Sequence, residues 1–233
     1  LVAPDSYYGR VRDICDEYGV LLIYDEVMTG AGRTGKFLAA EHWSITPDIV
    51  AMSKGFGAGY APLGAIVAGA RLVEPILNAG GFQHGFTYAG NPLACSAGLA
   101  VLEELEDLGL IENAARMGEV LMGELRALMD RYPFIGDVRG KGLLTAFEFV
   151  SDRTAMEPLD PKLNAYDRLV ELAYARGLII YSRRTRGGKA GDHFLVAPPL
   201  IITEDQIAEM MAILRDALDA FATEIGLPVE SAA

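Results

Sequence analysis

The chain has 233 residues, 51% of them hydrophobic, which is enough to form a sizeable core in one large domain or two small ones. It carries 20 Lys and Arg against 32 Asp and Glu, a net charge of −12 at pH 7. This balance argues against nucleic acid and anionic membranes as partners, because both favour clustered Lys and Arg.

Membrane insertion and disulfide bonding are also disfavoured. No secretory signal opens the chain, and its longest uncharged run, "GFGAGYAPLGAIVAGA", is rich in Gly and shorter than the ~18 apolar residues of a membrane span. Cys15 and Cys95 lie in apolar surroundings on expected helices, where a small buried hydrophobic residue is more usual than a disulfide partner. We therefore expect a soluble protein of the reducing cytoplasm.

The first hundred residues alternate between helical and strand-like patterns. Residues 6–18 have apolar positions at helical spacing and are followed by Gly19, a suitable residue after a helix. The apolar runs at 20–24, 49–52 and 65–69 are typical of strands buried on both faces. This order, with glycine-rich joints, favours an α/β layer with a mainly parallel sheet.

Two helices are expected next. In "GNPLACSAGLAVLEELEDLG", Asn91 suits the N-cap, Pro92 the first helical position and Gly109 the end of the helix. Residues 111–131 continue as a second amphipathic helix, whose leucines and methionines share one stripe typical of core packing.

The pattern changes again after Pro133. Residues 142–150 alternate like a half-exposed strand, and residues 162–176 predict a helix, followed by the strands "LIIY" and "FLVA". Thr203 and Gln206 have the spacing of a capping box that opens the last helix. This part of the chain therefore predicts a separate α+β unit.

The string "GAGRTG" (30–35) matches the G-x-G-x-x-G pattern of dinucleotide-binding loops, but its context does not. Five residues, "DEVMT", separate it from the preceding strand, whereas the true fingerprint begins at the strand end. Asp48 has nearly the spacing of the ribose-binding acid but precedes its strand instead of ending it. We expect a surface loop without dinucleotide binding.

An acid and a lysine follow two of the expected strands. Asp25 comes directly after residues 20–24, and Lys54 follows residues 49–52, with several glycines behind it that give a flat ligand room to approach. Sheet ligands bind beyond the carboxyl ends of parallel strands. Each residue alone is typical of a loop cap or a solvated lysine, but together they indicate one organic cofactor.

Pyridoxal phosphate (PLP) needs such a pair. Its aldehyde forms a Schiff base with a lysine, and a carboxylate holds the pyridinium N–H. A carboxylate beside the ring nitrogen favours the protonated ring, which can then accept electrons from the substrate carbon. Lys54 can be neutral in a partly desolvated site and can move a proton between substrate and cofactor.

Several segments carry a family resemblance. "LLIYDEVMTGAGRTGKF", "PDIVAMSKGFGAGYAPLGAIVA" and "HGFTYAGNPLACSAGLAVLE" strongly resemble class III (omega) PLP-dependent aminotransferases of fold type I. "IGDVRGKGLLTAFEFV" and "DHFLVAPPLIIT" are similar to the small domain of that family. The resemblance implies that 1–110 are the C-terminal part of a PLP-binding large domain, 111–134 a connecting helix, and 135–233 a small α+β domain.

The resemblance also implies roles for individual residues. Asp25 is similar to the acid paired with the pyridine nitrogen, Val27 to the residue packed on the ring face, and Lys54 to the Schiff-base lysine. Thr87 is similar to a threonine that reaches the cofactor phosphate of the other subunit, and Phe86 is expected to line that pocket. The family implies a homodimer with shared active sites; without the resemblance, Thr87 would be interpreted as a turn residue.

Substrate recognition is expected near "YSRRTRGGKAGDHF". In related enzymes an arginine before this kind of segment meets the substrate carboxylate, and here Arg183, Arg184 and Arg186 are available. We select Arg184, with a solvated basic loop as the alternative. His42 and the other two histidines have no ligand spacing, so no metal site is expected.

The upstream half of the family pattern does not occur in the sequence. The segment that cradles the phosphate and the aromatic residue that stacks on the ring are both missing, so we expect a fragment or a chain with a separate partner, binding PLP weakly by itself. The function implied is transfer of an amino group from a primary amine or ω-amino acid to a keto acid such as pyruvate. The alternatives are an aminomutase on the same scaffold and an inactive fragment that acts only by association.

Overall fold

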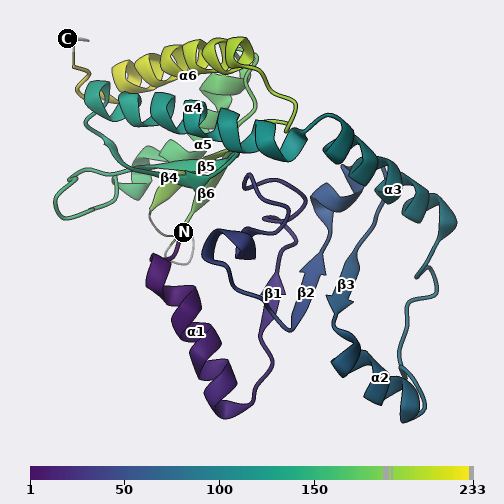
Figure 1. The fold of residues 1–233 in the computed structure, drawn as a ribbon. Coiled ribbons are helices and arrows are strands. Elements are labelled where there is room, and N and C mark those ends of the chain that lie inside the picture. Colours follow the sequence, from purple (N-terminus) through teal and green to yellow (C-terminus); the bar gives the residue numbers. More distant parts are fainter. Residues whose placement is uncertain (186–188, 190, 231–233) are drawn as a thin grey trace. The chain divides into compact units, whose positions relative to one another are not determined.

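A computed structural model gives the fold of the chain and describes residues 1–185, 189 and 191–230. The chain forms two compact units, one of Ala3–Glu112 and the other of Leu1–Val2 with Asn113–Ala233. Each unit has its own β-sheet (Figure 1).

The N-terminal unit contains a three-stranded sheet of β1 (Ile23–Asp25), β2 (Ile49–Met52) and β3 (Ala65–Ala68), in that order. β1 and β2 are parallel, whereas β2 and β3 are antiparallel. The long connection from β1 to β2 allows a crossover, while the glycine-rich connection to β3 turns the chain straight back. The predicted α/β class is confirmed, with a mixed sheet in this chain.

The N-terminal unit has the helices α1 (Asp5–Tyr18), α2 (Ala70–Asn78) and α3 (Pro92–Asp107). Of these, α1 and α3 follow the signals expected from the sequence. α1 ends at Gly19, which has φ = 63°. The side chain of Asn91 caps α3 by accepting bonds from the next backbone N–H groups, at 3.0 and 3.1 Å. The C-terminal end of α1 and the N-terminal end of α3 were both predicted from the sequence, whereas α2 was not predicted.

Burial in the N-terminal sheet differs from the expectation. In the central strand β2, Val50 and Met52 are buried, as predicted. In the outer strands, Ile23 is 60% exposed, Ile66 72% and Val67 56%. The prediction of strands buried on both faces is therefore wrong for β1 and β3, because each of them is an edge strand in this sheet.

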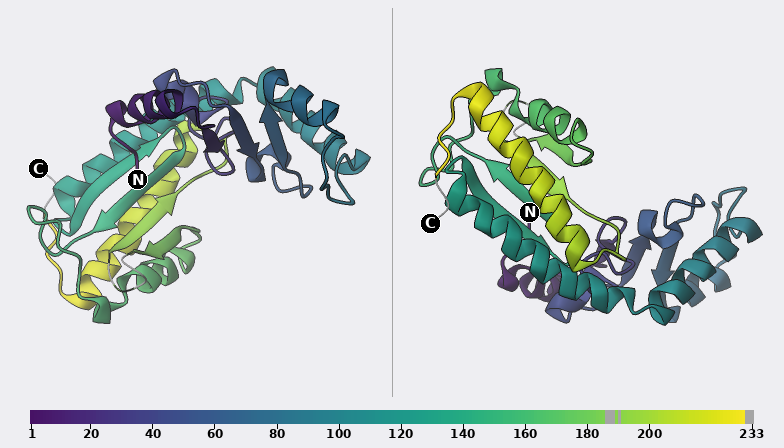
Figure 2. Two further views of the ribbon diagram at one scale, coloured as in Figure 1. Left: turned by 90° about the horizontal axis from the view of Figure 1, so that it is seen from below. Right: turned by 90° about the horizontal axis from the view of Figure 1, so that it is seen from above.

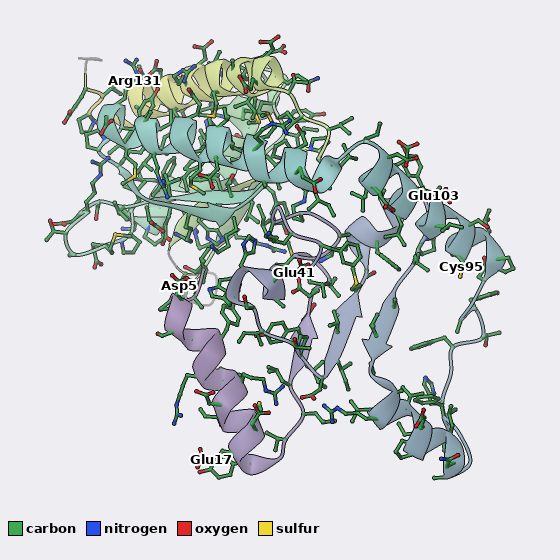
Figure 3. The ribbon with its side chains drawn as sticks, viewed as in Figure 1. Asp5, Glu17, Glu41, Cys95, Glu103 and Arg131 are labelled. Carbon is green, nitrogen blue, oxygen red and sulfur yellow. The ribbon has the colours of Figure 1, made fainter. Side chains whose placement is uncertain are left out.

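The only tryptophan of the chain lies in this unit. The ring of Trp43 packs on that of Tyr8 with 4.1 Å between centroids. Its Nε1 donates to Asp5 Oδ1 at 3.1 Å, near the start of α1, where Asp5 is labelled in Figure 3. These contacts fix the Ala39–Trp43 turn against α1.

The C-terminal unit has an antiparallel sheet in the order β4-β5-β7-β6. Its strands are β4 (Ile135–Lys141), β5 (Leu144–Phe149), β6 (Tyr181–Arg184) and β7 (Asp192–Val196). β5 alternates between buried and half-buried residues, as predicted. The predicted "LIIY" strand is wrong in position, since β6 begins at the last residue of that run, and β4 was not predicted.

The described residues of this unit also form the α-helices α4 (Leu110–Arg131), α5 (Ala165–Tyr174) and α6 (Glu204–Ile225). Figure 2 shows α4 and α6 side by side over one face of the sheet. The predicted capping box of α6 is present: Thr203 N donates to Gln206 Oε1 at 3.1 Å, and Gln206 N to Thr203 Oγ1 at 3.3 Å.

The core cluster lies entirely within the C-terminal unit. Stacked aromatic pairs join the sheet to itself and to α6, with ring centroids 4.9 Å apart for Phe147 and Phe194 and 5.3 Å for Phe149 and Phe221. Of the methionines predicted for the core of α4, Met117 and Met122 are buried in this cluster, and Met129 is half-buried against it. In the part of the chain that the structure describes, no helix is both long and apolar enough to cross a membrane.

Candidate functional site

Asp25 and Lys54 lie at the same edge of the N-terminal sheet. Asp25 is the last residue of β1 and is paired with Ala51 of β2. Lys54 follows two residues after β2 ends. Because the two strands are parallel, their carboxyl ends meet at one edge, and both side chains are exposed there.

The backbone of Lys54 has an unusual conformation. Its φ is 45°, in the left-handed region that costs a residue with a side chain about 1–3 kcal/mol. Lys54 opens a short turn, Lys54–Gly57, and Ser53 before it donates from Oγ to the carbonyl oxygen of Leu63 at 2.9 Å. The strained turn is thereby tied to the chain that returns into β3.

The carboxylate of Asp25 is fixed from its own turn. Val27 N donates to Asp25 Oδ1 at 3.0 Å, and this contact uses one of the two carboxylate oxygens. Val27 itself lines a cavity of about 800 Å³ in the N-terminal unit. The turn therefore presents a carboxylate and an apolar side chain next to each other.

This cavity brings two of the predicted site residues together. Val27 and Phe86 both line it, along with the end of β2 and the start of α3. Thr87 is exposed beside Phe86 and is not among the lining residues. Cys95, labelled in Figure 3, also lines the cavity and is exposed, so its predicted burial is wrong, while Cys15 is buried.

The loop "GAGRTG" is largely buried, which corrects the prediction of a surface loop. Gly30, Ala31 and Thr34 are all buried. The reason is close packing: a Cβ on Gly30 would lie 2.8 Å from the carbonyl oxygen of Glu26.

Glu26 was not predicted to have a role from the sequence. It is 3% exposed, although it follows the exposed residue Asp25 directly. The signal that could have identified Glu26 was the presence of two adjacent acids at the end of a strand.

Glu26 also influences two neighbouring tyrosines. Burial raises the pKa of Tyr24, and the negative charge of Glu26 adds to that increase. Burial likewise raises the pKa of Tyr8, with smaller contributions from Tyr7 and Glu26. Both phenols therefore stay neutral to a higher pH than an ordinary tyrosine, whose pKa is 10.0.

The predicted substrate arginine lies in the C-terminal unit. Arg184 Nε donates to Asp192 Oδ1 at 2.6 Å and its Nη2 to Oδ2 at 3.2 Å, while the guanidinium carbon lies 4.3 Å from the ring centre of Tyr166. Arg183 lies over the ring of Tyr181 at 4.8 Å. Arg186 is outside the described residues.

The donor set of the N-terminal unit is compatible with PLP. It offers an exposed amine, a carboxylate held by its own turn, and an apolar wall that includes Val27, although neither Asp25 nor Lys54 lines the cavity itself. These are the groups that an aldehyde, a pyridinium N–H and a ring face require. Among the described residues there is no cluster of three His, Cys, Asp or Glu side chains that could hold a metal ion.

Comparison with known proteins gives consistent matches. A taurine–pyruvate aminotransferase of Bilophila wadsworthia is 37% identical, covering 97% of this chain and 50% of that protein. A leucine/methionine racemase of Thermococcus litoralis is 38% identical, covering 94% of this chain and 46% of that protein. A PLP-bound amine transaminase from an uncultivated Pseudomonas species has a TM-score of 0.86 and 40% identity, covering 94% of this chain and 49% of that one.

The chain spans about half the length of the curated relatives it matches. The family model Aminotransferase class-III matches residues 1–218. The α/β fold, with its mixed sheet, is part of the PLP-transferase fold type I, as the match to solved transaminases indicates. The chain belongs to the class III aminotransferases.

Proposed function

We propose that this chain carries the lysine and the pyridine-binding acid of a PLP-dependent aminotransferase. The observation that supports this most directly is that Asp25 and Lys54 both lie at the carboxyl edge of two paired parallel strands. When bound, PLP would serve as the electron sink and the carrier of the amino group. The residues of the chain hold the ring, orient it and move protons.

Lys54 has two tasks in this proposal. Its amine attaches the cofactor through the aldehyde, and after release it moves a proton to and from the substrate carbon. The left-handed turn aims a flexible side chain from a rigid backbone, which limits the positions that Nζ can occupy. Asp25 holds the protonated ring nitrogen, and Val27 packs on the ring face.

The remaining roles concern the second subunit and the substrate. Thr87 and Phe86 are exposed, which is compatible with their reaching the active site of a second copy in a homodimer. For the substrate carboxylate we propose Arg184, which must exchange its ion pair with Asp192 for the substrate. The donor is a primary amine or ω-amino acid, and the acceptor is a keto acid such as pyruvate. Two free cysteines fit a cytoplasmic location.

Trapping of PLP tests the central claim. The chain is incubated with PLP and borohydride: the amine condenses with the aldehyde with loss of water, and borohydride supplies the hydride that leaves a stable secondary amine. Peptide mapping by mass spectrometry should find the adduct mainly on Lys54 and should not find it there in Lys54→Ala. Lys36→Ala, which removes another exposed lysine of the same unit, serves as the control.

Equal labelling of all exposed lysines would contradict the proposal, as would a total incorporation of PLP that Lys54→Ala lowers no more than Lys36→Ala does. A non-catalytic role through association alone predicts that result. Transfer itself is measured on the full-length protein that contains this chain, with a panel of amine donors and with pyruvate or 2-oxoglutarate as acceptor.

A second candidate function is isomerisation, either aminomutase or racemase chemistry. It is favoured by one relative, which is named a leucine/methionine racemase. The same residues can serve both reactions, since both need proton transfer at a substrate carbon. The dependence on a separate keto acid distinguishes them: an aminotransferase requires it, and an isomerase turns over without it.

A further inference from the structure

Glu26 makes four hydrogen bonds within the N-terminal unit. Its backbone N–H donates to the carbonyl of Ala51 at 2.9 Å, which continues the pairing of β1 with β2. Its side chain accepts a bond from the backbone N–H of Ala40 at 2.9 Å and another from the hydroxyl of Thr29. Its carbonyl accepts from Gly30 N at 2.9 Å. This buried acid thus fixes the chain on both sides of the turn after Asp25.

The loop held by Glu26 packs against the turn of Lys54. A Cβ built on Gly55, the residue after Lys54, would lie 3.5 Å from the Cβ of Ala31. Ala31 is 4% exposed and has φ = 53°, so its position is tightly constrained. Contacts therefore run from Glu26 through Gly30 and Ala31 to the backbone that presents Lys54.

We propose that Glu26 is a positioning residue that keeps Asp25 and Lys54 in register for a shared ligand. This inference rests on the proposed function. Glu26 reaches Asp25 through the covalent chain and the β2 ladder, and it reaches Lys54 through the "GAGRTG" loop. The glycine string, which has no phosphate-binding context, is then a packing element between two cofactor contacts.

The hydrogen bonds of Glu26 suggest that its geometry matters more than its charge. A glutamine at this position keeps one oxygen to accept from Ala40 N and an amide that can donate to the hydroxyl of Thr29, because a hydroxyl both donates and accepts. Glu26→Gln should therefore preserve the loop, whereas Glu26→Ala leaves Ala40 N–H and the hydroxyl unpaired in a buried place.

The experiment measures the rate at which borohydride fixes PLP on Lys54, relative to the rate on Lys36. Glu26→Ala should lower the rate at Lys54 by about tenfold or more, since small displacements of a reacting group have large effects. Glu26→Gln should restore the rate. Thr29→Val serves as a second variant in case Glu26→Ala does not fold. It removes only one of the two side-chain hydrogen bonds of Glu26, so the labelling rate at Lys54 should fall by less than tenfold.

Asp48→Asn provides a matched control for loss of stability. Asp48 is a partly buried acid of the same unit, but it lies before β2, at the opposite end from Lys54, and bonds to Arg12, Arg71 and Leu22 N. This variant should lower the melting temperature followed by circular dichroism and leave the ratio of Lys54 to Lys36 labelling unchanged.

Each outcome has a distinct meaning. If the unmodified chain shows no preference for Lys54, the proposed function fails. If it does show that preference and Glu26→Ala or Thr29→Val retains it, the positioning role fails. If Glu26→Gln loses the preference for Lys54 as fully as Glu26→Ala does, the effect is due to charge. If Asp48→Asn loses it to the same extent, the effect is due to general stability. Either result overturns the inference.

Discussion

Gly118 and Gly123 lie on the same helix, α4, yet their surroundings are opposite. A Cβ on Gly118 would lie 2.4 Å from the carbonyl carbon of Gly142, which is backbone and cannot move aside easily. A Cβ on Gly123 would meet nothing within 4 Å. The first glycine is required by packing, and the second only weakens the helix.

Alanine substitutions should therefore have opposite effects. Gly118→Ala should destabilise the C-terminal unit by about 3 kcal/mol through overpacking. Gly123→Ala should stabilise it by up to about 1 kcal/mol, because alanine has the higher helix propensity. Urea unfolding followed by circular dichroism measures both. A loss of stability in Gly123→Ala, or none in Gly118→Ala, would show that the local packing differs from that described.

At the residue scale, the sequence allowed candidate site residues to be predicted, but not the residues that hold them in place. Asp25 and Lys54 could be selected because each follows an apolar run, and strand ends converge in parallel sheets. Glu26 and Ser53 could not, since their bonds to Ala40 and to Leu63 join residues ten or more positions apart and depend on how loops fold back. Spacing along the chain contains no information on such contacts.

At the element scale, the C-terminal end of α4 is joined to α6 by a hydrogen bond from a buried tyrosine. Tyr132 is fully buried, and its Oη lies 2.9 Å from Asp219 Oδ1, while Arg131 Nη2 donates to the same carboxylate at 3.0 Å. Burial raises the pKa of Tyr132 to about 12; the bond from Arg131 lowers it and the bond to Asp219 raises it. The helix pair therefore keeps this phenol protonated.

This shift predicts a pH-dependent loss of stability. The folded pKa of about 12 is above the unfolded value of 10.0, so the contribution is fully present below pH 10 and is lost as the pH rises towards 12. The stability difference between the wild type and Tyr132→Phe should shrink by about 2 kcal/mol between about pH 9 and pH 11.5. Urea unfolding at the two pH values measures it, and a constant difference would contradict the shift.

Elements with strong local signals were predicted from sequence, and others were not. α3 and α6 carry side-chain caps, Asn91 and Thr203, whose bonds form within three residues. β4 was missed because glycines and charged residues interrupt its alternation of apolar and polar residues. It is a strand because its backbone pairs with β5. β1 starts later than its apolar run because its register is set by pairing with β2.

At the scale of the whole molecule, the two units differ in how much apolar surface each buries. The aromatic core belongs to the C-terminal unit, whereas the sheet of the N-terminal unit leaves Ile23, Ile66 and Val67 exposed. Local stability follows buried contacts. The N-terminal unit should therefore open at a lower free energy than the C-terminal unit.

Hydrogen exchange with mass spectrometry can test this difference on the full chain. Amides of β1 and β3 should exchange faster than those of β5 and β7, and the protected amides should lie mainly in the C-terminal unit. Uniform protection across both sheets would mean that the exposed strands are covered by association in solution.

The position of Trp43 also determines what optical methods report. It is the only tryptophan, and it packs on Tyr8 in the unit that carries Asp25 and Lys54. Indole emission therefore follows the N-terminal unit alone, while far-ultraviolet dichroism averages over both units. Melting curves recorded by both methods on one sample would therefore distinguish the unfolding of the N-terminal unit from that of the C-terminal unit without any label.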